Sequence, residues 1–355
     1  MKINRGFCLI LGLVVFCGIV LPSYTGDGGR KDNNAHIKIN VPKGWPKPTH
    51  DFEKKPVTTQ GFELGRKLFF DPVLSGDSTI SCASCHLPYT NFTHVDHALS
   101  HGIGGLKGTR NTLSIINVAW NKSFMWDGGI NNIEVQPLAP IESKVEMHSS
   151  LSIILPRLKR STWYREKFKM AFGEKTEITG QLFLKALSQY MLALQSSNSK
   201  YDKVMRNEKG IAFSETEARG LELFRKNCSS CHTEPLFTNH AFENNGLEPD
   251  SYLKDGGRIK ITHKESDSLK FRVPSLRNIE LSYPYMHDGR YRNLQMVLFH
   301  YSDDIHQTVN LSDKLKKPLK FTEQQKNDII AFLKTLTDMD FLRNPEYTYK
   351  PETTK

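Results

Sequence analysis

The sequence predicts a mainly α-helical protein in which two similar domains follow one another and carry long loops. Three observations support this fold class. A Cys-x-x-Cys-His pentapeptide occurs twice, a wider spacing pattern recurs in each half, and helical periodicity is strong where strand signals are weak. About 330 of the 355 residues remain after a predicted N-terminal signal, which is enough for two domains.

The pentapeptide is the attachment signal for c-type haem. The two copies are Cys82-Ala-Ser-Cys85-His86 and Cys228-Ser-Ser-Cys231-His232. In each copy the cysteines, expected at the start of a helix, would bind the porphyrin as thioethers, and the histidine would ligate the iron. A zinc site with four thiolates is the alternative, but it does not explain why a histidine follows both pairs directly. We therefore predict two cytochrome c-like haem domains in tandem and two covalently bound haem c groups.

The N-terminus has the pattern of a secretory signal. A basic start precedes the apolar stretch Gly6–Leu21, and small and polar residues follow it. A retained anchor is disfavoured because the run is short for a bilayer span, and Val15-Phe16 disfavours a lipoprotein cleaved before Cys17. Only Cys8 and Cys17 lie outside the haem motifs, so a mature chain has no disulfide. We predict a periplasmic protein with no stable membrane insertion after signal cleavage.

An internal repeat supports the division into two domains. Ser114 and Asn117 are followed by Trp126-Asp127-Gly128, and Ser275 and Asn278 are followed by His287-Asp288-Gly289. The spacings are the same in both halves, so Trp126 and His287 are counterparts. The predicted segments are a signal (1–25), a leader (26–48), an N-terminal haem domain (49–205), a C-terminal haem domain (206–343) and a tail (344–355).

Helix signals accompany both haem motifs. Ser214-x-x-Glu217 is a capping box before a helix that runs up to Cys228, and Asp71-Pro72 ends the helix before the first motif. Apolar periodicity predicts a further helix over 178–195, and Thr322-x-x-Gln325 caps another near the C-terminus. The helix near the C-terminus would pack beside the second haem, and the apolar surface of each haem would stabilise a domain rich in loops.

The charge pattern excludes nucleic acid as a partner. The net charge is +10, and four haem propionates would offset part of it. Lysine and arginine are scattered along the chain, with no basic run interleaved with aromatic residues. A weakly basic, solvated surface follows from this composition.

The chain resembles the bacterial di-haem cytochrome c peroxidase family, including its branch similar to the methylamine-utilisation protein MauG. The resemblance covers nearly all of the mature sequence. The matching segments are Ser75–His86, Gly108–Asn111, Phe124–Gly128, Val145-Glu146-Met147, Val273–Asn278 and Pro284–Gly289. It implies that the N-terminal haem reacts with peroxide and that the C-terminal haem passes electrons to it.

The resemblance assigns catalytic roles to Glu146 and Trp126. In the family a glutamate over the peroxidatic haem handles protons, and a tryptophan between the haems couples them. Cleavage of the O–O bond needs a proton moved from one oxygen to the other, which a carboxylate can do. Glu142 is the nearest rival to Glu146. From the residues alone, either glutamate would be a solvated loop charge and Trp126 a core residue.

The resemblance also suggests axial ligands. Family peroxidases use a methionine at the second haem and the MauG-like branch a tyrosine, and the matching segment here favours Tyr301, with Met296 and His300 as alternatives. A phenolate favours higher iron oxidation states than a thioether does. His101 lies where the family places a displaceable ligand of the first haem, but its glycine-rich surroundings resemble the MauG-like branch and leave a loop histidine open. His94 and His97 are weaker candidates.

The family further implies a calcium ion between the domains. Asn111 and the backbone near Pro274 match its ligands, and such oxygen ligands suit calcium. The expected activity is reduction of hydrogen peroxide to water with electrons from a small cytochrome c or a cupredoxin. The alternatives are a MauG-like oxidase that modifies residues of a partner protein, and a non-enzymatic di-haem electron carrier. A homodimer is an open alternative to a monomer.

Overall fold

The computed structural model describes residues 34–349. The predicted signal, with Cys8 and Cys17, lies outside the described residues. Helices dominate, as predicted, and β1 (Phe242–Glu243) and β2 (Phe271–Arg272) form one short antiparallel pair. The helices are α1 (Thr59–Phe70), α2 (Cys82–Cys85), α3 (Leu138–Glu142), α4 (Leu151–Arg160), α5 (Thr162–Phe172), α6 (Gly180–Ala193), α7 (Lys200–Met205), α8 (Glu215–Asn227), α9 (Ile259–Thr262), α10 (Leu294–Asp303), α11 (Glu323–Lys334) and α12 (Met339–Leu342).

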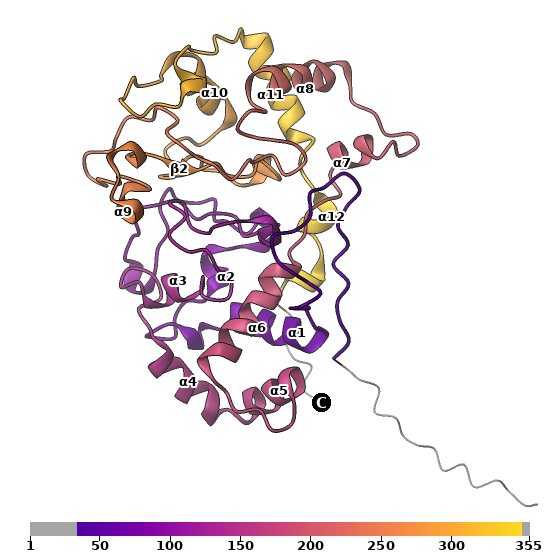
Figure 1. Cartoon of the computed structure of the whole chain (residues 1–355), viewed down its shortest axis with the longest axis vertical. Coiled ribbons are helices and arrows are strands. Elements are labelled where there is room, and N and C mark those ends of the chain that lie inside the picture. The colour runs from indigo at the N-terminus through magenta and orange to yellow at the C-terminus, as the bar shows by residue number, and fades with distance from the viewer. Residues whose placement is uncertain (1–33, 350–355) are drawn as a thin grey trace, which may run out of the picture. The chain divides into compact units, whose positions relative to one another are not determined.

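We call the half of the chain that carries the Cys82–His86 motif the first module. It is organised by the packing of α1 against α6 (Figure 1). The two helices pack closely at Gly65, where an added Cβ would lie 2.0 Å from the carbonyl oxygen of Ala186. Phe69, at the end of α1, is buried in the same core. Asp71 ends α1 directly before Pro72, as the sequence predicts.

The second module, which is the half that carries the Cys228–His232 motif, repeats this packing with α8 and α11. These two helices lie side by side in Figure 1. A Cβ added at Gly220 would lie 1.9 Å from the carbonyl oxygen of Asp328. The two glycines are therefore counterparts, each allowing close contact between a helix before the pentapeptide and a later helix of the same module. Both predicted capping boxes, at Ser214 and Thr322, are confirmed.

The loops repeat as well as the helices. Asn117 and Asn278 have positive φ values of 52° and 57°, and each begins a short 3₁₀ helix, Val118–Trp120 or Ile279–Leu281. Asparagine tolerates this left-handed conformation better than most residues. The repeated spacing in the sequence thus corresponds to a repeated backbone path.

The two pentapeptides differ in local structure. Cys82 and Cys85 bound helix α2, as predicted. Cys228, in contrast, is the C-terminal cap of α8, and turns follow it. The expectation that both motifs begin a helix is therefore wrong for the second, because α8 extends as far as its first cysteine.

The chain returns to the first module at its end. Phe341 and Leu342 of α12 belong to the buried apolar cluster of α1 and α6, although α11 belongs to that of the second module (Figure 1). The proposed domain limits, 49–205 and 206–343, stay a prediction. Among residues 34–349, no helix is both long and apolar enough to cross a membrane.

Candidate haem sites and active centre

The first pentapeptide opens onto a cavity of about 330 Å³. Cys82, Cys85 and His86 line one part of it, and apolar side chains from α1 and α6, among them Phe69 and Leu187, line another. The close packing of α1 against α6 at Gly65 places these side chains on the cavity wall. The cavity thus joins the haem-attachment motif to an apolar wall.

The second pentapeptide opens onto a cavity of about 200 Å³. Cys228, Cys231 and His232 line it together with Phe224 of α8 and Leu333 of α11. The two cysteine pairs therefore line different cavities. One zinc ion bound by all four sulfur atoms does not fit this arrangement.

The two motif histidines are held in the same way. The Nδ1 atom of His86 lies 2.8 Å from the Phe92 carbonyl oxygen, and that of His232 lies 3.1 Å from the Phe237 carbonyl oxygen. Because a carbonyl only accepts, Nδ1 donates, and Nε2 keeps the lone pair that a metal needs. Burial lowers the pKa of His232 to about 4 and also lowers that of His86.

A buried cation between the cavities gives a further test of the fit to haem. Arg272 is 6% exposed and lines both cavities. Among residues 34–349 its side chain has no carboxylate partner, only the Met125 carbonyl at 3.4 Å, and burial lowers its pKa to about 10. A buried charge needs a counterion, and a haem propionate would supply one. The residues present therefore fit two c-type haems.

Glu146 lines the first cavity at a position fixed by the glycine-rich loop. A Cβ added at Gly102 would lie 2.2 Å from the Glu146 carbonyl oxygen, and the Ile103 amide donates to that oxygen at 2.9 Å. Burial raises the pKa of Glu146, and hydrogen bonds with Ser143 and Ser100 oppose the shift. Its rival Glu142 is exposed and does not line the cavity.

His101 also lines the first cavity. Its carbonyl oxygen is 3.3 Å from the Cys85 sulfur, and its ring stacks on that of His97 at 3.4 Å. His94 and His97 line neither haem cavity. The three histidines therefore lie in one row, with only His101 at the cavity wall.

Tyr301 is the candidate ligand that lines the second cavity. Burial raises its pKa to about 12, so its phenol stays neutral at pH 7 unless a cation binds it. Met296 is 41% exposed, and Nε2 of His300 bonds the Asn245 carbonyl at 2.9 Å. Neither Met296 nor His300 lines the cavity.

Trp126 lines both cavities. Its indole N–H donates to the Asn111 carbonyl at 2.8 Å, and its own carbonyl accepts from the Arg272 amide at 2.7 Å. The His287 ring is 6.5 Å away, centroid to centroid, and nearly perpendicular. The repeat therefore places both counterparts, Trp126 and His287, at the junction of the modules.

The two residues matched to calcium lie on different cavities. Asn111 lines the first, where its side-chain amide donates to the Ala98 carbonyl at 2.8 Å. Pro274 lines the second. A backbone hydrogen bond connects the two modules here, because the main-chain N–H of Asn111 donates to the His287 carbonyl oxygen at 2.7 Å.

Sequence reasoning missed Arg272 and Met286. Arg272 directly precedes a matched segment, but a lone arginine is usually a surface charge. Met286 lines the second cavity, and the Asn245 amide lies 3.5 Å from both its sulfur and the Tyr301 hydroxyl. The repeat contained a signal for it, since Met125 precedes Trp126 as Met286 precedes His287, and both have positive φ. Met286 is thus a further candidate ligand.

Two family patterns match the chain. The family described as di-haem cytochrome c peroxidase matches residues 59–210, and the cytochrome c family matches residues 217–337. The matches coincide with the two halves that carry the pentapeptides. Each cavity therefore lies in a segment with its own family match.

Similar proteins cover most of the chain. The methylamine utilization protein MauG of Methylorubrum extorquens is 32% identical over 318 residues, 88% of this chain and 87% of that protein. The cytochrome c551 peroxidase of Nitrosomonas europaea is 33% identical over 279 residues, 78% of this chain and 79% of that protein.

Solved structures have the same fold. The crystal structure of a MauG-like protein associated with microbial copper homeostasis is 32% identical, with a TM-score of 0.76, and covers 88% of this chain and 99% of that one. The diheme peroxidase BthA of Burkholderia thailandensis, 22% identical with a TM-score of 0.69 over 82% of this chain and 91% of its own, has a similar fold. With relatives named both as peroxidases and as MauG, the chain is an oxidoreductase that belongs to the di-haem cytochrome c peroxidase family, whose members carry two haem c groups.

Proposed function

We propose that the protein is an exported, periplasmic peroxidase that reduces hydrogen peroxide to water. Two electrons from a small cytochrome c or a cupredoxin and two protons convert each peroxide molecule into two water molecules. The bound haems supply the redox chemistry. The observation that carries the proposal is a partly buried glutamate, Glu146, with a raised pKa on the wall of the first cavity.

Glu146 would move the proton within the peroxide. As a carboxylate it accepts a proton from one peroxide oxygen, and as a carboxylic acid it donates that proton to the other, which leaves as water. Burial raises the pKa of Glu146, which makes the carboxylic acid form easier to reach than in a solvated glutamate. Ser100 and Ser143, which bond its side chain, would orient the carboxyl group.

Trp126 would connect the two cavities for electron transfer. Its ring lies at the wall of both, and the hydrogen bond to Asn111 fixes its orientation. Arg272, on the same two walls, would bind haem propionates. Electrons delivered at the second haem would then reach the first through the region that Trp126 and Arg272 line.

For the second haem we propose that His232 and Tyr301 would hold the iron. Tyr301 lines the cavity that His232 also lines, while Met296 and His300 do not. Iron would lower the pKa of the phenol and allow it to bind as phenolate. Met286 is the rival that its position on the same cavity suggests.

A MauG-like oxidase that modifies a partner protein is the second candidate function. The presence of Tyr301, rather than a methionine of α10, at the second cavity favours it. In that case the electrons come from side chains of the partner instead of a small redox protein. The third alternative, a di-haem electron carrier without catalytic activity, is disfavoured because the chain belongs to a family of oxidoreductases.

Three further parts of the proposal concern calcium, His101 and export. Asn111 and the carbonyls near Pro274 would hold calcium, and oxygen ligands of this kind fit that ion. His101, on the wall of the first cavity, would be a displaceable ligand of the first iron. The basic and apolar pattern of residues 1–25 would direct the chain to the periplasm.

Steady-state kinetics would test the proposed function. Purified two-haem protein should consume peroxide with stoichiometric oxidation of a reduced small cytochrome c or cupredoxin, two donor molecules per peroxide. Absence of donor oxidation at full haem content would contradict the peroxidase. Peroxide-dependent, covalent modification of a partner protein under the same conditions would support the second candidate instead.

A further inference from the structure

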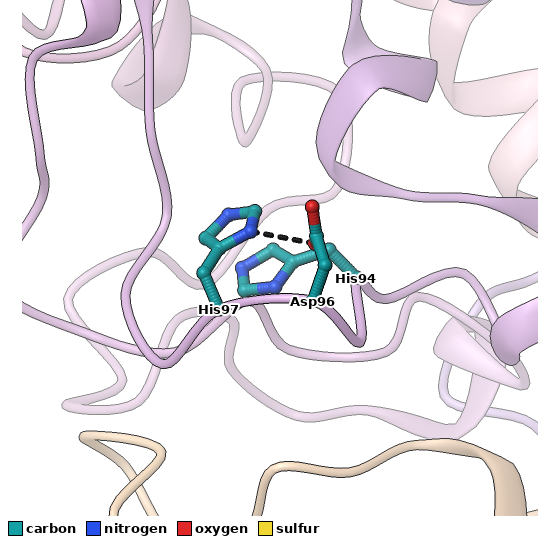
Figure 2. Close-up of side chains that lie close together, drawn as sticks. All are labelled: His94, Asp96 and His97. Atoms are coloured by element: carbon teal, nitrogen blue, oxygen red, sulfur yellow. Dashed lines mark ion pairs between the residues drawn. The ribbon is translucent and has the colours of Figure 1, made fainter.

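His94, Asp96 and His97 form a cluster of potential metal ligands outside both haem cavities. One ligand atom of each residue lies within 4.8 Å of those of the other two. Figure 2 shows the two imidazole rings one over the other, with the Asp96 carboxylate beside them. None of the three lines either haem cavity, so haem does not explain the cluster.

Three ring nitrogens of His94, which is buried, and His97, which is partly buried, lack hydrogen-bond partners within residues 34–349. His94 is 1% exposed, and neither of its ring nitrogens has a hydrogen-bond partner within residues 34–349; Nε2 of His97 also lacks one. Leaving such a buried polar atom unsatisfied costs about 1–3 kcal/mol. A neutral imidazole has a lone pair on one of its two ring nitrogens, so each of these two adjacent rings can offer one unsatisfied nitrogen to a ligand that accepts a lone pair.

The third residue completes a suitable donor set. The Asp96 carboxylate lies 2.6 Å from Nδ1 of His97, and its side chain is 76% exposed, so an ion can reach it from solvent. Two imidazoles and one carboxylate suit zinc, copper and nickel rather than magnesium or calcium. The His94 and His97 rings are stacked with their centroids 3.9 Å apart, so rotation of the side chains is needed to turn one nitrogen of each toward a common point.

We propose that His94, Asp96 and His97 bind one divalent transition-metal ion, for which zinc is the simplest representative. Two imidazole nitrogens and one carboxylate oxygen hold it, and water completes the coordination. The His101 ring stacks on the face of His97 away from His94, because the His94–His101 separation is 6.4 Å. A bound ion would thus fix the segment that leads to the wall of the first haem cavity.

Zinc binding by the untagged two-haem protein would test this inference. After treatment with a chelator, isothermal titration with Zn²⁺ and metal analysis after gel filtration should show one zinc per chain besides two irons. Asp96→Asn and His94→Gln should each weaken binding at least about tenfold. Asp96 is exposed, so Asp96→Asn keeps the test valid even if His94→Gln folds poorly.

His36→Gln is the matched control, because His36 is an exposed histidine outside the cluster. It should retain wild-type zinc affinity. No zinc retained by the wild type, or the same affinity in Asp96→Asn as in the wild type, would overturn the proposal. Peroxide turnover is not needed for the readout, so failure of the proposed peroxidase function would leave this result unaffected.

Discussion

The two modules share a scaffold but differ in the polar side chain that faces each cavity. Gly65 and Gly220 allow the same helix crossing, and His86 and His232 are held by equivalent carbonyl bonds. The first cavity, however, has the carboxyl group of Glu146 on its wall, whereas the second has the phenol of Tyr301. Duplication thus preserved what binds a haem, and the two copies differ in the groups that act on it.

The two cavities also differ in volume. The first has about 330 Å³ and the second about 200 Å³. A reactive haem needs room for peroxide beside the porphyrin, whereas an electron-transfer haem needs two ligands and close packing. We therefore expect substitutions in the scaffold to affect both modules alike and substitutions of the facing groups to affect one haem only.

The largest expected effect is that of Glu146→Gln. Glutamine keeps the size but cannot carry the proton, so peroxide turnover should fall by roughly 100-fold while both haems stay attached. Steady-state rates at matched haem content measure this. Glu142→Gln, four residues earlier and exposed, is the control and should keep its rate; equal loss in both variants would remove the role from Glu146.

Alanine at the two crossing glycines would test the equivalence of the scaffolds. The added methyl would meet backbone oxygens about 2 Å away in both modules, so Gly65→Ala and Gly220→Ala should each cost about 1–3 kcal/mol of unfolding free energy. Guanidinium titration followed by circular dichroism measures it. Glu222→Ala, exposed on α8, should change little, and a strong effect in one module alone would contradict the equivalence.

Trp126→Phe should slow electron exchange between the modules by roughly tenfold, without changing haem content. Phenylalanine removes the indole and its hydrogen bond to Asn111. Rapid mixing of the half-reduced protein with peroxide would measure the rate. Trp120→Phe is a matched control, because Trp120 is buried and bonds a carbonyl, that of Pro46, but lines neither haem cavity; equal slowing in both variants would exclude a special role for Trp126.

A smaller effect is expected on the pH dependence of turnover. Burial raises the folded-state pKa of Glu146 above 4.5, and activity needs the carboxylate, so the rate should fall as pH decreases through that higher value. Ser100→Ala removes a bond that lowers the pKa, and should move this acid limb to higher pH. Ser149→Ala, a buried serine whose hydroxyl has no partner within residues 34–349, should leave it in place; a limb that Ser100→Ala does not move would contradict the assignment to Glu146.

Much of the scaffold follows from local sequence rules. The capping boxes at Ser214 and Thr322 and the stop at Asp71-Pro72 depend on residues within one helical turn, so the sequence alone predicts them. The packing of α12 against the first core depends on residues more than a hundred positions away, and no local pattern indicates it.

The candidate site was predictable in its motifs and less so in its surroundings. Glu146, Trp126 and Tyr301 lie on the cavities where the family resemblance suggests them, while their roles stay predictions. The sequence did not indicate a role for Arg272, because its neighbours come from β2 and from Trp126 of the other module. A buried arginine without a carboxylate partner can be recognised only after folding brings both cavities to it.

Cyanide binding to the oxidised protein tests the difference between the modules most directly. A haem without a strong second ligand binds cyanide, and a haem ligated by Tyr301 resists it. We predict one cyanide per chain in the wild type and two in Tyr301→Phe, measured by titration in the Soret band. Two cyanides, or none, bound by the wild type would contradict the account. If Tyr301→Phe still binds one cyanide per chain, the second ligand is Met286 rather than Tyr301.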